Sequence, residues 1–338
     1  MSSRPIIFFD VEPWEQERLP AHIAGHTVVS RPERLDRETA LLAREAAAVS
    51  VFAWSAVSRP VLEQLPAVRF IAARSTGFDH IDLAACAEFG IAVANVPGYG
   101  ERTVAEHTFA LILALSRNLM HSFDRTRAGS FSREGLRGFD LEGKRLGVIG
   151  TGKIGAKVSR IGLAFGMRVV AFDVQRNPEL EAAGVDYVPS AAAVLGQADV
   201  ITLHVPLTEE TRHLISMETI ERIQPGAVLI NTARGDLVQT AALLSALDRG
   251  ILRGAGLDVL EDERLVGEEA EVLSQGAPSN EALAAMLRNH VLLSKPNVLI
   301  TPHNAFNSEE SLEKLLATTV ANLEAFFAGT PQNVVGVS

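Results

Sequence analysis

The chain alternates short apolar runs with segments of helical pattern along most of its length. In order, the apolar runs read PIIFFD, VSVFAW, VRFIAAR, IAVANV, RLGVIG, RVVAFD, VITLHV, AVLINTA, AGLDV and NVLIT. Strands that alternate with helices in this way pair in parallel sheets. Because the runs are apolar almost throughout, rather than at every second residue, helices are expected on both faces of each sheet. The sequence therefore predicts an α/β fold of doubly wound parallel sheets, Rossmann-like or flavodoxin-like.

The number of strands and the chain length predict two domains. Ten strands are more than one ordinary sheet holds, and 338 residues exceed what a single hydrophobic core usually spans. A T-x-x-E pattern at Thr103 and Glu106 predicts the start of a long helix that leads into a second domain. An amphipathic pattern after NVLIT predicts a helix that returns to the first. We expect a discontinuous first domain of residues 1–101 and 303–338, a second domain of residues 102–302, and a cleft between them.

The charge and cysteine content exclude several classes of protein. Nucleic acids and anionic membranes bind clusters of Lys and Arg, whereas this chain has a net charge of −10. Neither nucleic acid nor a membrane is therefore an expected partner. Cys86 is the single cysteine of the sequence, so no disulfide or cysteine-based metal site can form within the chain. No long apolar segment occurs near the N-terminus, and we expect a cytoplasmic protein.

A glycine motif predicts a dinucleotide site. Gly150, Gly152 and Gly155 have G-x-G-x-x-G spacing directly after the strand RLGVIG and before a helix. Such glycines allow a tight turn and the close approach of a pyrophosphate to the helix N-terminus. The next strand ends at Asp173, 18 residues after Gly155, where a carboxylate can accept hydrogen bonds from the adenosine ribose. Because Asp173 would repel a 2′-phosphate, NAD is favoured over NADP. Arg176, three residues after Asp173, leaves NADP open. The structural alternative for the three glycines is a turn that only packs a strand against a helix.

Three polar residues follow later strands, where open parallel sheets bind their ligands. Arg234 follows AVLINTA, Glu263 follows AGLDV, and His303 follows NVLIT. A hydride transfer to a 2-keto acid needs a cation that holds the carboxylate and polarises the carbonyl, and an acid that protonates the developing alkoxide. An arginine fork matches the first requirement. A histidine whose imidazolium is favoured by a neighbouring glutamate matches the second.

Each of these residues also has a purely structural explanation. A histidine after a strand is often a hydrogen-bonded structural residue, and an arginine there is often a cap or an ion-pair partner. Glu263 lies in an acidic stretch from Glu261 to Glu271 that is typical of a solvated surface insertion. The functional interpretation is favoured because all three residues share one edge of a sheet that also carries the glycine motif.

Six motifs occur in order along nearly the whole chain: ARSTGFDHIDL, NVPGYGERTVAEHTFALIL, GVIGTGKIG, NTARGD, GLDVLEDE and ITPHNAF. Together they resemble the D-isomer-specific 2-hydroxyacid dehydrogenase family, and most closely its NAD-dependent D-lactate dehydrogenase branch. The resemblance implies NAD-dependent reduction of a small 2-keto acid, with pyruvate favoured, to the D-2-hydroxy acid. It also implies a homodimer, no catalytic metal, a substrate domain formed by the first domain and an NAD-binding second domain.

The resemblance also assigns roles to individual residues. It implies that Arg234 binds and polarises the substrate, that His303 is the acid/base, and that Glu263 is the carboxylate paired with it. The residues implied to bind substrate are Thr76, Gly77, Tyr99 and Trp54. The resemblance implies that the cofactor is bound by the glycine motif, by Asp173 and by residues after later strands. These residues are Gly150, Gly152, Lys153, Ile154, Gly155, Asp173, His204, Val205, Pro206, Thr211, Thr232, Ala233 and Asp258.

One residue departs from the family pattern, and it bears on the substrate. Relatives specific for lactate often have Tyr where VFAW places Trp54. If Trp54 lines the pocket, it restricts the size of the group on C2 of the substrate. If Trp54 is instead a core aromatic at a strand end, it has no effect on the substrate.

Several alternative functions remain. Formate dehydrogenases pair the histidine with Gln, so Glu263 argues against them. Glyoxylate or hydroxypyruvate reductases and short phosphoglycerate dehydrogenases share the same three residues. A non-catalytic NAD-sensing protein, like the corepressors built on this fold, would also retain them. Glu106 and His107 could suggest a metal site, but a helix-capping acid and a helix residue explain them better.

Overall fold

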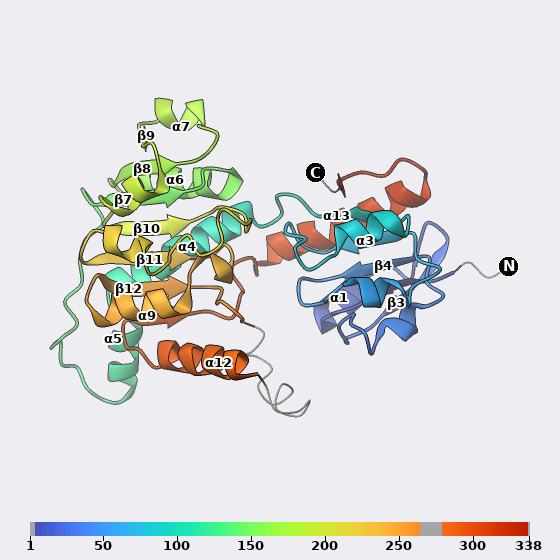
Figure 1. Ribbon diagram of the computed structural model, residues 1–338, viewed down its shortest axis with the longest axis horizontal. Coiled ribbons are helices and arrows are strands. Elements are labelled where there is room, and N and C mark those ends of the chain that lie inside the picture. The colour runs from blue at the N-terminus through green and yellow to red at the C-terminus, as the bar shows by residue number, and fades with distance from the viewer. Residues whose placement is uncertain (1–3, 264–278, 337–338) are drawn as a thin grey trace. The chain divides into compact units, whose positions relative to one another are not determined.

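The computed structural model describes residues 4–263 and 279–336, and the chain divides into two compact units (Figure 1). Unit 1 comprises Met1–Tyr99 and Ser308–Ser338, and unit 2 comprises Gly100–Asn307. The sequence pattern predicts residues 303–307 in the first domain, but here they belong to unit 2. The reason is that their backbone is hydrogen-bonded to Asp258 at the end of a unit 2 strand.

Unit 1 contains a seven-stranded sheet in the order β14-β6-β5-β4-β1-β3-β2. The five inner strands β6, β5, β4, β1 and β3 are parallel, whereas β14 and β2 each pair antiparallel with a neighbour at the two ends of the sheet. Its strands are β1 Ile6–Phe8, β2 His22–Ile23, β3 His26–Ser30, β4 Ala48–Val51, β5 Phe70–Ala73, β6 Ala92–Ala94 and β14 Val334–Val335; its helices are α1 Pro13–Arg18, the 3-10 helix η1 Ala40–Ala43, α2 Arg59–Leu62, α3 Leu83–Glu88 and α13 Glu309–Phe327.

Unit 2 contains a second seven-stranded sheet, parallel throughout, in the order β13-β12-β11-β10-β7-β8-β9. Its strands are β7 Arg145–Ile149, β8 Arg168–Phe172, β9 Asp186–Tyr187, β10 Val200–Leu203, β11 Ala227–Asn231, β12 Leu252–Leu257 and β13 Val298–Ile300; its helices are α4 Glu101–Ser116, α5 Leu119–Arg127, α6 Lys153–Ala164, α7 Pro178–Ala182, α8 Ala191–Leu195, the 3-10 helices η2 Thr219–Arg222 and η3 Gly235–Leu237, α9 Thr240–Asp248 and α12 Asn280–Leu293.

Both sheets have a buried core on each face, as the apolar strands predict. In unit 2, Val148 and Ile230 pack with α4 and α6 on one face, and Ile149 and Leu229 pack with α8 and α9 on the other. In unit 1, one face packs against α2 and α3 and the other against α13, which lies along the sheet in Figure 1. The predicted α/β fold with two doubly wound sheets is confirmed. Among the residues that the structure describes, no helix has the length and apolarity needed to cross a membrane.

The start of α4 differs from the predicted one. The helix begins at Glu101 with Gly100 as its N-cap, so Thr103 and Glu106 lie inside the helix and form no capping box. The carboxylate of Glu101 is instead 3.3 Å from Lys153 Nζ and 3.7 Å from Lys157 Nζ. These ion pairs connect the start of α4 to α6, the helix that follows the glycine motif.

Candidate active site

The predicted catalytic residues lie at one edge of the unit 2 sheet. Arg234 follows β11, Glu263 follows β12, and His303 follows β13. These three strands are parallel neighbours in the sheet, so their carboxyl ends lie side by side. Glu263 and His303, which are 40 residues apart in the sequence, are thereby brought to the same edge as Arg234.

His303 and Glu263 form a hydrogen-bonded pair. His303 Nδ1 lies 2.9 Å from Glu263 Oε1, and both side chains are only about a quarter exposed. The second carboxylate oxygen of Glu263 accepts a bond of 3.4 Å from the amide of Leu260. His303 has a positive φ of 50°, a strained conformation for a residue with a side chain. The Glu263 carboxylate therefore orients the imidazole ring, and the turn at His303 fixes the backbone that carries it.

The turn that carries His303 is organised by the buried carboxylate of Asp258. Asp258 Oδ1 accepts bonds from Thr301 Oγ1 at 2.6 Å and from the amide of Asn304 at 3.0 Å, and Oδ2 accepts one from the amide of Ala305 at 2.9 Å. The amide of His303 donates to the backbone oxygen of Asp258. A carboxylate that accepts this many bonds fixes the conformation of the turn. In this structure Asp258, predicted to lie near the nicotinamide, orients the His303 turn.

His107 on α4 extends the same network, which the sequence did not reveal. His107 Nε2 is 3.0 Å from Thr301 Oγ1 and 3.6 Å from Asp258 Oδ1. The sequence predicts only a helix residue at this position. Because His107 and Thr301 are 194 residues apart, no local pattern could have revealed the contact.

Arg234 is held in an ordered loop after β11. The side chain of the fully buried Asn231 donates to the backbone oxygen of Arg234 at 2.7 Å and accepts from the amide of Ala233 at 3.1 Å. Arg234 Nη1 donates to the Ala233 oxygen at 2.7 Å. Thr232 is anchored to α4, because its hydroxyl lies 3.0 Å from that of Thr108. Asn231 is thus a supporting residue that the motif NTARGD contains but that the sequence alone did not single out.

The glycine motif has the shape that a pyrophosphate requires. Gly150 has φ of +93°, and a Cβ there would lie 2.5 Å from the His204 carbonyl oxygen. A Cβ on Gly155 would lie 1.9 Å from the Gly150 oxygen, so α6 can approach the turn only with glycine present. Gly152 faces open space, with nothing within 4 Å of a Cβ. The first amides of α6, from Lys153 and Ile154, lie at the helix N-terminus, where they have no acceptor within the helix.

Asp173 closes the other side of the predicted nucleotide site. Its Oδ2 accepts bonds from the amide and the hydroxyl of Thr151, and its Oδ1 accepts one of 3.0 Å from the amide of Gln175. Arg176 is directed elsewhere: it lies 3.3 Å from Glu181 and over the ring of Tyr187. The position of Asp173 after β8 fits a ribose-binding carboxylate, and Arg176 is engaged by other groups.

The remaining predicted cofactor residues surround the end of β10. His204 Nε2 is 2.9 Å from Thr202 Oγ1, and burial lowers the pKa of the imidazole to about 3, so the ring is neutral at physiological pH. Thr211 Oγ1 donates to the Pro206 oxygen at 2.7 Å and thereby closes the loop that begins at Val205. His204 is consequently a poor candidate for the proton donor.

The predicted substrate residues lie in unit 1. Thr76 Oγ1 donates to the Val96 oxygen at 2.9 Å, and Asn95 donates to the Thr76 oxygen at 2.7 Å. The loop that contains Gly77 follows β5 and is fixed in this way to the segment after β6. Tyr99 and Trp54 are both half-buried, and the guanidinium of Arg34 lies 5.9 Å from the Trp54 ring.

The described part of the acidic stretch after β12, residues 261–263, differs from the expected solvated insertion. Glu261 is only 16% exposed and lies 2.7 Å from His213 Nε2. The rest of the stretch, from residue 264 onward, lies outside the described residues. Within residues 4–263 and 279–336, no three His, Cys, Asp or Glu side chains converge in a metal-binding arrangement.

The sequence profile of the family described as "D-isomer specific 2-hydroxyacid dehydrogenase, NAD binding domain" matches residues 109–305. The chain belongs to this family. The dehydrogenase is 38% identical to D-lactate dehydrogenase of Escherichia coli (strain K12) over 291 residues, 86% of each chain. It is 34% identical to glyoxylate reductase of Aeropyrum pernix over 339 residues, which cover 97% of this chain and 90% of the relative.

A solved structure agrees with this assignment. The crystal structure of D-lactate dehydrogenase from Aquifex aeolicus, complexed with NAD and lactic acid, matches the dehydrogenase with a TM-score of 0.85 and 38% identity over 96% of both chains. The predicted family and the predicted cofactor are confirmed: the protein is an NAD-dependent D-2-hydroxyacid dehydrogenase. The glycine turn, the amides of α6 and Asp173 are the groups of this chain that fit the cofactor.

If Asp173 binds the adenosine ribose, its replacement should change the preference for NADH over NADPH. We expect Asp173→Ser to lower kcat/KM for NADH about 10-fold, because a charge-assisted hydrogen bond to the ribose is lost. The ratio of kcat/KM for NADPH to that for NADH should rise, since the carboxylate no longer repels a 2′-phosphate. Steady-state kinetics with both cofactors measure this, with the exposed Asp186→Ser as the matched control. An unchanged NADH value in Asp173→Ser would contradict the assignment.

Proposed function

We propose that this dehydrogenase reduces pyruvate to D-lactate with NADH. The observation behind the proposal is the hydrogen bond between His303 and Glu263. Glu263 follows β12, and Arg234 follows the neighbouring strand β11. The Escherichia coli and Aquifex aeolicus relatives, both named D-lactate dehydrogenases, support pyruvate as the substrate. The glyoxylate reductase among the relatives keeps glyoxylate as the second candidate.

His303 supplies the proton. Its Nδ1 is bonded to Glu263, so the proton transferred to the substrate oxygen is the one on Nε2. The Glu263 carboxylate stabilises the positively charged imidazolium before transfer and keeps the ring in one orientation afterwards. Bound NADH supplies the hydride that reduces C2 of the keto acid. Histidine is then returned to its charged form by a proton from solvent.

Arg234 binds the substrate carboxylate and polarises the keto group. Its planar fork of donors matches two oxygens at once, which the single ammonium of a lysine cannot do. Asn231 restrains the backbone of Arg234 so that the guanidinium is in place before the substrate arrives. From unit 1, we assign the backbone amides of Thr76 and Gly77 to the same carboxylate and Tyr99 and Trp54 to the group on C2.

The cofactor is held by residues at the ends of β7, β8, β10, β11 and β12. The amides of Lys153 and Ile154 bind the pyrophosphate, and Asp173 binds the adenosine ribose. We assign the adenosine side of the site to Val205, Pro206 and Thr211 with the neutral His204, and the nicotinamide side to Thr232, Ala233 and Asp258.

Initial rates of NADH oxidation with a series of 2-keto acids test the substrate. Pyruvate, glyoxylate, hydroxypyruvate, phenylpyruvate, 2-ketoisocaproate and phosphohydroxypyruvate would be compared at equal concentrations. We expect the highest kcat/KM with pyruvate. A higher value with another acid would replace the substrate and keep the mechanism, whereas no turnover of any acid would favour an NAD-sensing binding protein.

We further propose that the enzyme is a cytoplasmic homodimer, with its interface on unit 2. Helix α5 has no buried residue, and it exposes Leu119, Met120 and Phe123, while Phe131 after it is 84% exposed. Exposed apolar side chains on one helix and the segment after it favour association with another protein surface. The free thiol of the buried Cys86 is compatible with a reducing compartment.

A charge placed on this surface tests the dimer. We expect the wild-type protein to have the mass of a dimer by light scattering after gel filtration, and Phe123→Glu to have that of a monomer. Leu41→Glu, at a similarly exposed leucine of unit 1, is the control and should remain dimeric. A monomeric wild type, or a dimeric Phe123→Glu, would contradict the proposed interface.

A further inference from the structure

Unit 2 contains a second histidine–glutamate pair directly beside the catalytic one. His213 Nε2 lies 2.7 Å from Glu261 Oε1, and Glu261 precedes Glu263 by two residues. The second oxygen of Glu261 accepts a 2.8 Å bond from the amide of Thr240, the first residue of α9. Both carboxylate oxygens of Glu261 are therefore used, one by an imidazole and the other by a helix N-terminus.

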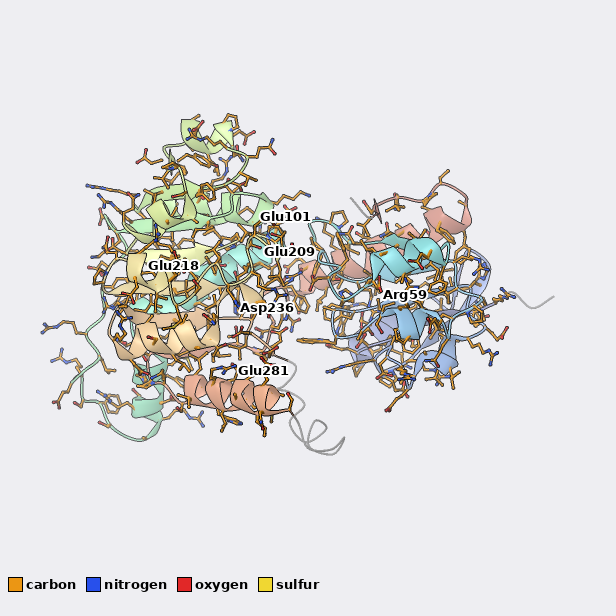
Figure 2. All side chains as sticks on the ribbon, in the orientation of Figure 1. Arg59, Glu101, Glu209, Glu218, Asp236 and Glu281 are labelled. Carbon is orange, nitrogen blue, oxygen red and sulfur yellow. The ribbon has the colours of Figure 1, made fainter. Side chains whose placement is uncertain are left out.

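The His213 end of this pair is attached to the loop that carries Arg234. The amide of His213 donates to the Asp236 oxygen at 2.8 Å, and the neighbouring Arg212 forms an ion pair with the Asp236 carboxylate. Asp236, labelled in Figure 2, lies two residues after Arg234. His213 has a positive φ of 53°, so its backbone is held in a turn that side chains adopt only with support from their surroundings. One residue thus connects the Arg234 loop with the carboxylate of Glu261.

The two loops also touch through their backbones. A Cβ on Gly235 would lie 1.9 Å from the Leu260 oxygen and 2.7 Å from the Glu261 amide nitrogen. Only glycine permits this approach. The Glu261 backbone oxygen accepts a further bond of 3.1 Å from the buried Asn289 of α12. Residues 260–261 are consequently held from three directions immediately before Glu263.

We propose that the His213–Glu261 pair positions Glu263, and through it His303, relative to Arg234. The inference rests on the proposed function, because it assumes that Glu263 and His303 form the acid/base pair. Neither His213 nor Glu261 is placed in contact with the reacting atoms. Their effect is transmitted by the short segment from residue 261 to residue 263, whose displacement would lengthen the hydrogen bond between Glu263 and His303.

A double-mutant cycle distinguishes positioning from general stabilisation. We expect His213→Ala to lower kcat about 10-fold, because misplacing a supported catalytic group has effects of this order. In a Glu263→Gln background the same substitution should lower kcat by no more than about 2-fold, since the group through which it acts is already altered. KM for NADH should stay at its wild-type value. His213→Gln, which retains a donor for Glu261, should restore most of the activity.

Arg249→Ala is the matched control, because it breaks an exposed pair with Glu221 that also lies in unit 2 and includes no residue of either loop. It should leave kcat unchanged. Two results would overturn the proposal: His213→Ala lowering kcat equally in the wild-type and Glu263→Gln backgrounds, or His213→Gln being as inactive as His213→Ala. In either case active wild-type enzyme would leave the proposed function intact.

A spectroscopic measurement keeps the inference testable even if no keto acid is turned over. The nitrogen resonance of His303 Nδ1 reports its hydrogen bond with Glu263. We expect His213→Ala to shift this resonance in the same direction as Glu263→Gln does, with Arg249→Ala leaving it in place. A His303 signal identical to that of the wild type would overturn the positioning role, whereas absence of turnover alone would count against the proposed function.

Discussion

Replacing His303 with alanine is expected to lower kcat for keto-acid reduction by about 100- to 10,000-fold, the usual cost of removing a general acid. The substrate oxygen would then have to take its proton from water. Because His303 follows β13 and pairs with Glu263, whereas the glycine motif follows β7, binding of NADH should be preserved. Steady-state rates with pyruvate and fluorescence titration with NADH measure the two effects separately.

The control for this experiment is His22→Ala, at an exposed histidine of β2 in unit 1. It should retain wild-type kcat and KM. Undiminished turnover in His303→Ala would show that another group donates the proton. His204 is a poor candidate for this role, since burial lowers its pKa to about 3 and its ring is neutral.

For Arg234→Lys we expect kcat/KM for pyruvate to fall roughly 100-fold, because loss of a charge-assisted hydrogen bond costs about 1.5–3 kcal/mol. The positive charge is kept, so the change isolates the fork geometry from the charge itself. Arg234→Gln, which removes the charge too, should be less active still. Both variants are compared with the wild type by initial rates over a range of pyruvate concentrations.

Arg249→Lys is the corresponding control, because Arg249, directly after α9, also binds a carboxylate with two nitrogens, that of Glu221 on η2. It should show wild-type kinetics. If Arg234→Lys had an unchanged kcat/KM, Arg234 would not be the group that binds the substrate carboxylate.

The strands could be predicted from the sequence because burial on both faces makes them continuously apolar. Each of the ten apolar runs overlaps an observed strand, and Arg234, Glu263 and His303 follow three of them. Four of the strands that the structure describes gave no such signal. Strands β2, β9 and β14 have two residues each and lie at an end of a sheet, and no residue of β3 is fully buried. The predicted capping box failed because α4 continues one turn toward Gly100, where Lys153 and Lys157 bind Glu101.

The supporting contacts of the site could not be predicted, because they join residues distant in the sequence. His213 and Glu261 are 48 residues apart, and Thr301 and Asp258 are 43 residues apart. In the sequence, Glu261 is one of several acidic residues in a row. Only the fold shows that its carboxylate binds His213 and the amide of Thr240. The roles of the substrate and cofactor residues, like the homodimer, stay predictions.

The identity of the product tests the proposed substrate and the stereochemistry of its reduction together. Purified enzyme would be incubated with pyruvate and NADH, and the lactate formed would be separated into its two enantiomers by chiral chromatography while the absorbance of NADH is followed. We expect D-lactate in an amount equal to the NADH consumed, and at least about 100-fold less of it with His303→Ala over the same time. L-lactate, a racemic product, or NADH left unconsumed with pyruvate would contradict it.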